Sequence, residues 1–151
     1  MNLRPGSEIA LAWLSVLAWV AVIQIFASGS FSANETSLVI GPVLRWLFPG
    51  ADAESIAAVH FSIRKSAHFV EYAILALLAL RAFRTNSSRP LAWLVAASLV
   101  LAFAVAVVDE SRQAAAVERT GALSDVALDM GGAATALALA SATRRYWSAR
   151  T

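Results

Sequence analysis

Residues 91–108 read LAWLVAASLVLAFAVAVV and contain no charged side chain. A run of this length and polarity is typical of a transmembrane helix, because about 20 helical residues span the hydrocarbon core of a bilayer. Comparable apolar runs occupy residues 9–27, 67–84 and 126–143. The sequence therefore predicts an all-α membrane protein, in which one domain forms a four-transmembrane-helix bundle.

The composition of the whole chain agrees with this fold class. Hydrophobic residues make up 59% of the 151 residues and charged residues only 15%, which leaves more apolar surface than a soluble domain of this size could bury. The absence of cysteine excludes structural disulfides, thiolate catalysis and cysteine-ligated metals. The net charge of +2 could suggest nucleic acid, but the basic residues flank apolar runs, so we expect no nucleic-acid partner.

The first apolar run has an alternative interpretation as a secretory signal peptide, because Arg4 precedes it and small residues follow it. It is longer than the apolar region of a usual signal peptide, which favours a membrane span.

The basic residues indicate how the spans are oriented. Arginine and lysine in short flanking segments stay in the cytoplasm, so we expect both chain termini to be cytoplasmic. The residues that share this side are Arg4, Arg81, Arg84, Arg89, Arg144, Arg145 and Arg150. Most of the acidic residues then lie at the opposite, outer side.

The first outer loop, residues 28–66, contains the apolar stretch LVIGPVLRWLFPG. Because Pro42 and Pro49 interrupt this stretch, it is too short to span the bilayer. We expect an interfacial or re-entrant segment anchored by Trp46. From Asp52 onward the pattern is helical, and residues 53–64 are expected to continue into the second span.

Polar residues gather at the outer ends of three spans. Lys65, His68 and Tyr72 recur at helical spacing, with Glu71 beside them. The third span ends in VDESRQ, which contains Asp109, Glu110, Arg112 and Gln113. After a turn expected at Thr120 and Gly121, the fourth span begins with Ser124 as a candidate N-cap, followed by Asp125 and Asp129.

The free-energy cost of placing charged residues in a membrane favours the interpretation of this cluster as a functional site. A charge at the centre of a membrane helix opposes insertion by roughly 2.5–3.5 kcal/mol, so Glu71 and Asp129 are expected to face the bundle interior, paired or protonated. Singly, Lys65 and Asp125 have structural alternatives as snorkelling or capping residues. Gly131, Gly132, Ala136 and Ala140 are interpreted as a helix-packing stripe. A histidine with several carboxylates could bind a divalent cation, but no HExxH spacing occurs, so we expect no metal and no other cofactor.

Three strings together resemble the VanZ-like family of small bacterial membrane proteins: RKSAHFVEYAILALLALRAF, VDESRQ and RTGALSDVALDMGGA. The resemblance covers roughly residues 40–140. It implies location in the bacterial cytoplasmic (inner) membrane and an association with resistance to the glycopeptide teicoplanin. The site residues that it implies are Lys65, His68, Glu71, Tyr72, Asp109, Glu110, Gln113, Arg119, Asp125 and Asp129. The chain departs from the family pattern at Arg112, where His is frequent, and at residues 115–118, which lack the usual Pro-Gly.

The leading hypothesis from the sequence is an outer pocket that binds or modifies the headgroup of an anionic lipid or a lipid-linked cell-wall precursor. Lys65, Arg112 and Arg119 would attract the anion, and Tyr72, Gln113 and Asp125 would complete the binding site. In a catalytic form the acid–base groups would be His68, Glu71, Asp109, Glu110 and Asp129. The alternatives are a non-catalytic partner of another membrane protein, a homo-oligomer, or a small transporter. The nearly apolar cytoplasmic halves of the spans argue against a transporter.

Overall fold

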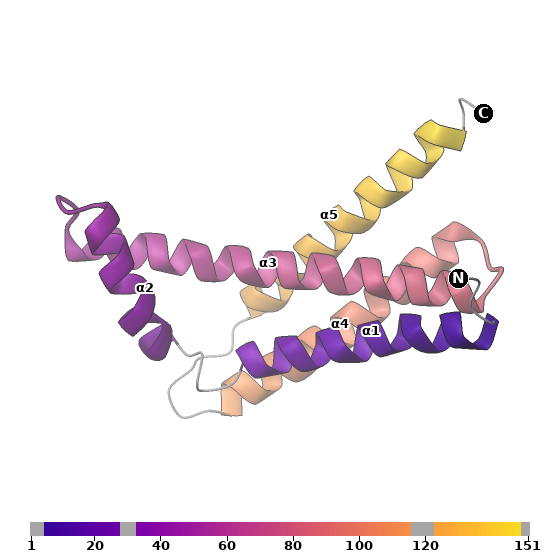
Figure 1. Ribbon diagram of the computed structural model, residues 1–151, viewed down its shortest axis with the longest axis horizontal. Coiled ribbons are helices and arrows are strands. Elements are labelled where there is room, and N and C mark those ends of the chain that lie inside the picture. Colours follow the sequence, from indigo (N-terminus) through magenta and orange to yellow (C-terminus); the bar gives the residue numbers. More distant parts are fainter. Residues whose placement is uncertain (1–4, 28–32, 116–122, 149–151) are drawn as a thin grey trace.

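The computed structural model describes residues 5–27, 33–115 and 123–148, and its regular elements are all α-helices (Figure 1). The helices are α1 (Pro5–Phe26), α2 (Ala33–Leu47), α3 (Ala53–Asn86), α4 (Leu91–Ala115) and α5 (Leu123–Ser148). Among the described residues, α1, α3, α4 and α5 are each long and apolar enough to cross a membrane. The predicted four-helix membrane bundle is confirmed, since each predicted span falls on one of these helices, with Ala27 one residue beyond the end of α1.

Helix α3 is longer than a single span requires. Its 34 residues extend roughly 50 Å at 1.5 Å per residue, against a hydrocarbon core of about 30 Å. The expected continuation of residues 53–64 into the second span is therefore confirmed. Asp52 caps the helix by accepting a hydrogen bond from the Ser55 backbone N–H at 2.6 Å, and this bond lowers the pKa of the Asp52 carboxyl.

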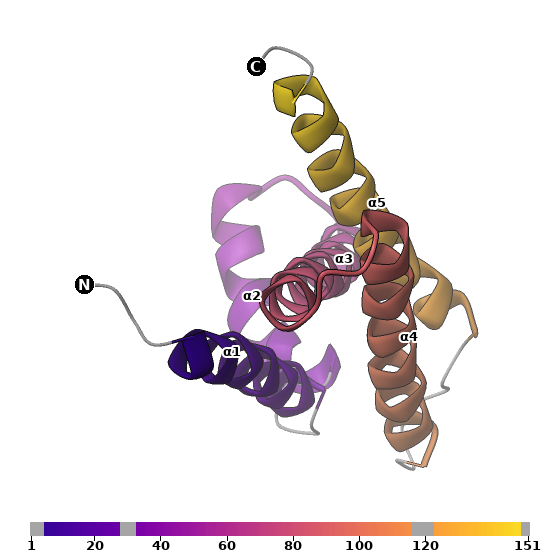
Figure 2. The ribbon, with the colours of Figure 1, turned by 90° about the vertical axis from the view of Figure 1, so that its right-hand side faces the viewer.

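Helix α3 also forms the centre of the bundle, with α1, α4 and α5 packed around it (Figure 2). Its buried face carries Leu75, Ala76 and Ala79, which are fully inaccessible. Small side chains let the backbones approach closely. The closest approach is at Gly132 of α5, where an added Cβ would collide with the backbone carbonyl of Phe69 on α3.

Helix α2 lies across the N-terminal part of α3, at the end of the molecule opposite both termini (Figure 1). At 15 residues it is too short to span a bilayer, as predicted for an interfacial or re-entrant segment. Pro42 lies within this helix rather than ending the apolar stretch. Leu38, Val39 and Trp46 are highly exposed on α2, with Trp46 at 79%. Helix α2 therefore carries exposed apolar side chains on its surface.

Aromatic residues cluster at the other end of the bundle. The ring of Phe83 packs edge-on against those of Trp13 and Trp93, with centroid separations of 5.2 and 6.2 Å. Arg89 lies over the Trp93 ring, 5.8 Å from its centroid. An aromatic and arginine cluster of this kind suits a membrane interface.

Candidate functional site

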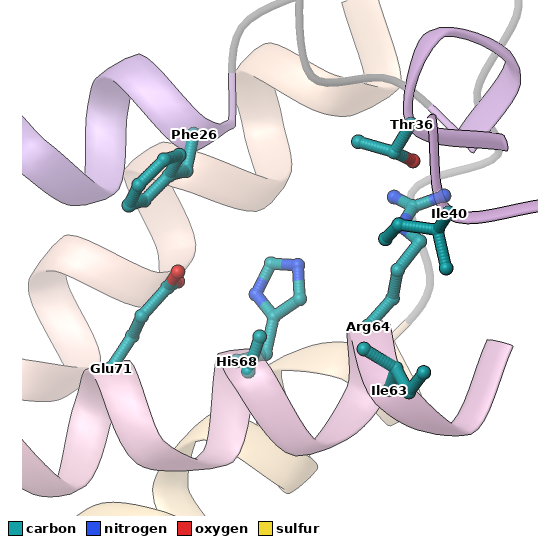
Figure 3. A pocket seen from close by; sticks show the side chains of 8 residues that line it. Phe26, Thr36, Ile40, Ile63, Arg64, His68 and Glu71 are labelled. Atoms are coloured by element: carbon teal, nitrogen blue, oxygen red, sulfur yellow. The ribbon is translucent and has the colours of Figure 1, made fainter. Parts of the chain in front are cut away.

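A pocket of about 230 Å³ lies where α1, α2 and α3 meet (Figure 3). Helix α3 contributes one side of it, and the end of α1 and the N-terminal half of α2 border the other. The lining residues are Phe26, Thr36, Ile40, Ile63, Arg64, Ala67, His68 and Glu71. Apolar side chains thus enclose a short row of polar ones.

The polar row comes from one face of α3. Arg64, His68 and Glu71 follow one another at intervals of four and three residues, which places them on one side of a helix. Figure 3 shows all three side chains projecting from α3 into the pocket, with Thr36 at the Arg64 end and Phe26 at the Glu71 end. The pocket therefore has a basic end and an acidic end, with an imidazole between them.

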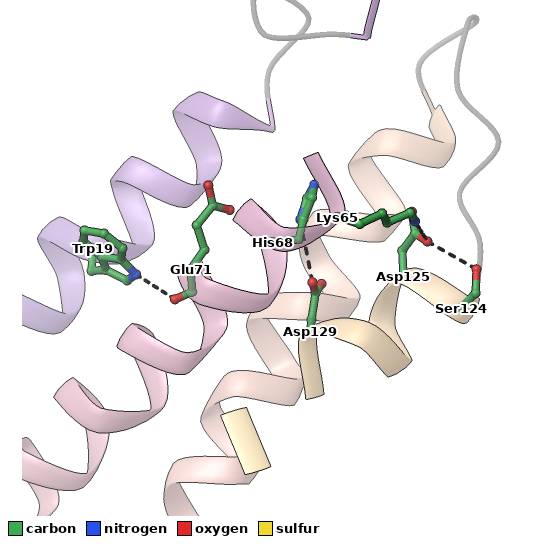
Figure 4. A network of polar contacts seen from close by, with 7 residues as sticks. All are labelled: Trp19, Lys65, His68, Glu71, Ser124, Asp125 and Asp129. Carbon is green, nitrogen blue, oxygen red and sulfur yellow. Dashed lines mark hydrogen bonds and ion pairs between the residues drawn. The ribbon is translucent and has the colours of Figure 1, made fainter. Parts of the chain in front are cut away.

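The position of Glu71 is fixed by a contact between helices. The indole N–H of Trp19 on α1 donates a hydrogen bond to the backbone carbonyl of Glu71 at 2.9 Å (Figure 4). This bond sets the level at which α1 lies against α3, so the acidic end of the pocket is held by the bundle itself.

His68 connects the pocket with α5. Its Nδ1 atom lies 3.7 Å from Oδ1 of Asp129, a residue that is only 3% exposed (Figure 4). An imidazole beside a carboxylate is suited to hold or transfer a proton. The structure thus brings together two predicted site residues from different helices.

Lys65 lies on a different side of α3. It donates a hydrogen bond to Asp125 of α5 and forms an ion pair with it (Figure 4). It borders a second hollow of about 270 Å³ between α3 and Leu128 of α5, not the pocket beside α1 and α2. Ser124, predicted to be an N-cap, lies inside α5 because the helix begins at Leu123; its hydroxyl donates to Asp125 at 3.2 Å.

Buried polar groups surround this region. Tyr72 is completely buried and Asp109 is 1% exposed. Within the described residues, the Tyr72 hydroxyl has no hydrogen-bond partner. Asp109 lies within electrostatic range of both Glu71 and Asp129, and Glu110 within range of Asp129. The acids predicted from the three spans therefore converge.

Comparison with known families agrees with this architecture. A protein-family model described as VanZ/LLP1 matches residues 9–144, which include all four spans and the pocket. The chain belongs to the VanZ/LLP1 family. No curated protein and no solved structure matches it.

Several family-motif positions of this VanZ/LLP1 member lie at the C-terminal end of α4. Arg112, which departs from the usual family residue, donates a hydrogen bond to Gln24 of α1 and thereby ties α4 to α1. Glu110 is partly buried. The side chain of Gln113 lies outside the described residues, as do Arg119 and the turn expected at Thr120 and Gly121.

Arg64 is the pocket residue that sequence reasoning missed. It belongs to the R-K-x-x-H string of the VanZ-like motif, but was treated only as part of the helix leading into the span. Its spacing from His68 and Glu71 was the available signal. Thr36 was also missed; it lines the pocket and shares a 3.1 Å hydrogen bond with His60, whose side chain is buried between α2 and α3. No sequence pattern links these last two residues, because they lie on different helices.

No group of three or more metal-ligating side chains occurs within the described parts of this VanZ/LLP1 chain. The donors that converge are one imidazole, carboxylates and nearby basic groups.

Proposed function

We propose that this VanZ/LLP1 protein binds the phosphate-bearing headgroup of an anionic lipid or a lipid-linked cell-envelope precursor at the outer face of the bacterial inner membrane. The observation that carries the proposal is the pair of side chains, Arg64 and His68, that projects into the pocket beside the apolar helix α2. Arginine presents a planar fork of donors that matches phosphate oxygens, and a histidine next to it can add one more donor.

The pocket size supports binding of a headgroup rather than of a whole lipid. At about 230 Å³ it lies below the roughly 300–1,000 Å³ of pockets that enclose drug-sized ligands. A phosphate and its substituent would enter the pocket, while the acyl or prenyl chains stayed in the bilayer.

The surroundings of the pocket support access for such chains. Ile40 and Ile63 line it, and the neighbouring surface exposes Leu38, Val39 and Phe61. Apolar side chains on both sides of a polar pocket would let a lipid remain partly in hydrocarbon while its headgroup is bound.

The same site also supports a catalytic form of the proposal. His68 beside Asp129 would accept or donate a proton at the bound headgroup, and Glu71, Asp109 and Glu110 would tune or share that proton. Binding without turnover uses the same contacts, so turnover of the bound lipid separates the two forms. The family's association with teicoplanin resistance is consistent with either form, since a protein that occupies an envelope precursor could alter access to it.

Two observations weigh against the other function classes. Towards the end that carries the termini, the described core is lined by Leu75, Ala79, Leu80 and Leu94, and the buried Ser98 hydroxyl donates to the carbonyl of Leu94 in its own helix. This part of the described core is unfavourable for a polar solute. On α5, Gly132 already packs against α3, so this part of the small-residue stripe does not lie free for a partner protein.

The test is native mass spectrometry of the full chain extracted from its host membrane. Wild type is expected to retain a phosphate-bearing lipid. Arg64→Ala should retain at least about tenfold less of this lipid, because a charge-assisted contact contributes more than about 1.4 kcal/mol to binding. Arg84→Ala, an exposed arginine at the other end of the same helix, is the matched control. Equal lipid retention in all three proteins would contradict headgroup binding and favour a partner-binding role.

A further inference from the structure

The two ends of the pocket differ in charge, and this difference bears on the ligand class. Arg64 and Thr36 form one end, and Glu71 and Phe26 form the other (Figure 3). Arg64 and Glu71 are seven residues apart, which is about 10 Å along the helix axis. Side chains on one helix pair with each other when they are three or four residues apart, so these two are too far apart along the helix to form such a pair. The two charged groups can therefore each contact a different part of one ligand.

The acidic end has the composition of an ammonium site. A carboxylate attracts a cation by its charge, and an aromatic ring attracts it by the negative potential of its face. Glu71 and Phe26 come from different helices and border the same pocket. The Trp19 hydrogen bond to the Glu71 backbone keeps α1 and α3 at this level.

The charge balance of the region points the same way. The described acids at this end are Asp52, Glu54, Glu71, Asp109, Glu110, Asp125 and Asp129, and the described basic side chains are Arg45, Arg64, Lys65 and Arg112. Lys65 is already paired with Asp125. A ligand carrying only negative charge would add to an excess of acids, whereas a ligand with its own cation would offset part of it.

We therefore propose that the pocket selects a zwitterionic headgroup of the phosphoethanolamine type, with the phosphate at Arg64 and His68 and the amine at Glu71 and Phe26. This inference rests on the proposed headgroup binding and specifies its chemical class. The same chemistry occurs in a membrane phospholipid and in a water-soluble phosphate monoester, and the experiment separates these two sources.

The experiment uses delipidated full-length protein in detergent micelles, with phosphatidylethanolamine and phosphatidylglycerol added at equal concentration. Native mass spectrometry is expected to show about a tenfold preference of wild type for phosphatidylethanolamine. Glu71→Gln should bind both lipids equally, because the phosphate contacts remain. Glu71→Asp should keep a preference, which shows that loss in the glutamine variant does not reflect misfolding. Glu54→Gln, an exposed acid in the first turn of the same helix, is the control and should behave as wild type.

Failure of this inference is distinguishable from failure of the proposed function. Equal binding of the two lipids by wild type, or an unchanged preference in Glu71→Gln, would overturn the zwitterionic class and leave headgroup binding intact. Unchanged binding of both lipids by Arg64→Ala would overturn headgroup binding itself.

Soluble competitors identify the source of the headgroup. Displacement of phosphatidylethanolamine by phosphoethanolamine but not by glycerol phosphate would support amine recognition and show that the headgroup alone suffices. Displacement by neither compound, with the lipid preference retained, would support a membrane lipid as the ligand. Equal displacement by both compounds would contradict amine recognition.

Discussion

At the scale of single residues, neighbouring positions on α3 have different tasks. Arg64 projects into the pocket next to α2, while Lys65 pairs with Asp125 of α5. Consecutive side chains on an α-helix diverge by about 100°, since the helix has 3.6 residues per turn. A doublet of basic residues in the sequence is thus divided between the pocket and a helix–helix contact.

The Lys65–Asp125 pair is expected to stabilise the α3–α5 contact by about 1 kcal/mol, because both side chains are about one-third exposed and water weakens their attraction. A double-mutant cycle of Lys65→Ala and Asp125→Ala, measured as unfolding free energy in mixed micelles, gives this coupling. Additive effects of the two substitutions would contradict the pair. The swapped protein, Lys65→Asp with Asp125→Lys, should recover part of the stability lost in either single charge reversal.

This prediction also distinguishes structural from ligand-binding roles. If Lys65 acts mainly through α5, Lys65→Ala should lower stability more than it lowers lipid retention. Arg64→Ala should do the opposite.

At the scale of the helices, the contact between α3 and α5 depends on the absence of a side chain. A Cβ at Gly132 would lie 2.9 Å from the Phe69 carbonyl carbon and closer still to its oxygen, and both are backbone atoms that cannot rotate away. The adjacent Gly131 has room, since a Cβ there would lie 3.7 Å from the Phe69 ring. Two adjacent glycines therefore differ in how strictly glycine is required.

Gly132→Ala is expected to destabilise the bundle by about 1–3 kcal/mol through overpacking. Gly131→Ala, the matched control, should cause no loss, because an ordinary van der Waals contact replaces empty space. Unfolding in mixed micelles measures both. A Gly132→Ala protein as stable as wild type would show that the two helices do not approach as closely as described.

At the scale of the whole molecule, the pocket and α2 lie at one end, and both termini lie at the other (Figure 1). Of the described basic residues, Arg81, Arg84 and Arg89 lie at the end that carries the termini, whereas Arg45, Arg64, Lys65 and Arg112 lie at the pocket end. If the arginines that flank the spans are cytoplasmic, as the sequence predicts, the pocket is on the outer side of the membrane. An outer position is what a site for envelope-lipid headgroups requires.

The orientation can be tested with single cysteines, because the chain contains none. Ala51→Cys, between α2 and α3, should react with a membrane-impermeant maleimide in intact cells. Ser88→Cys, between α3 and α4, should react only after permeabilisation. Both positions are exposed. The reverse labelling pattern would place the pocket in the cytoplasm and remove the basis for an envelope-precursor ligand.

The sequence by itself determined the class of protein, the four spans and the end at which polar residues gather. Apolar runs such as residues 91–108 are local properties, since each helix satisfies its own backbone hydrogen bonds and needs only enough apolar residues to cross the lipid. The acids of the third and fourth spans were identified for the same reason: a charge within an apolar run is costly wherever its neighbours lie.

Only the tertiary structure decided which of these residues meet. It turned Arg64, rather than Lys65, towards the pocket, brought Asp129 to His68, and placed Phe26 and Thr36 at opposite ends of the site. These contacts depend on how each helix is rotated about its axis and on the level at which it meets α3. Both are set by packing details such as Gly132 against Phe69 and Trp19 against Glu71, which involve residues far apart in the chain and leave no periodic pattern in the sequence.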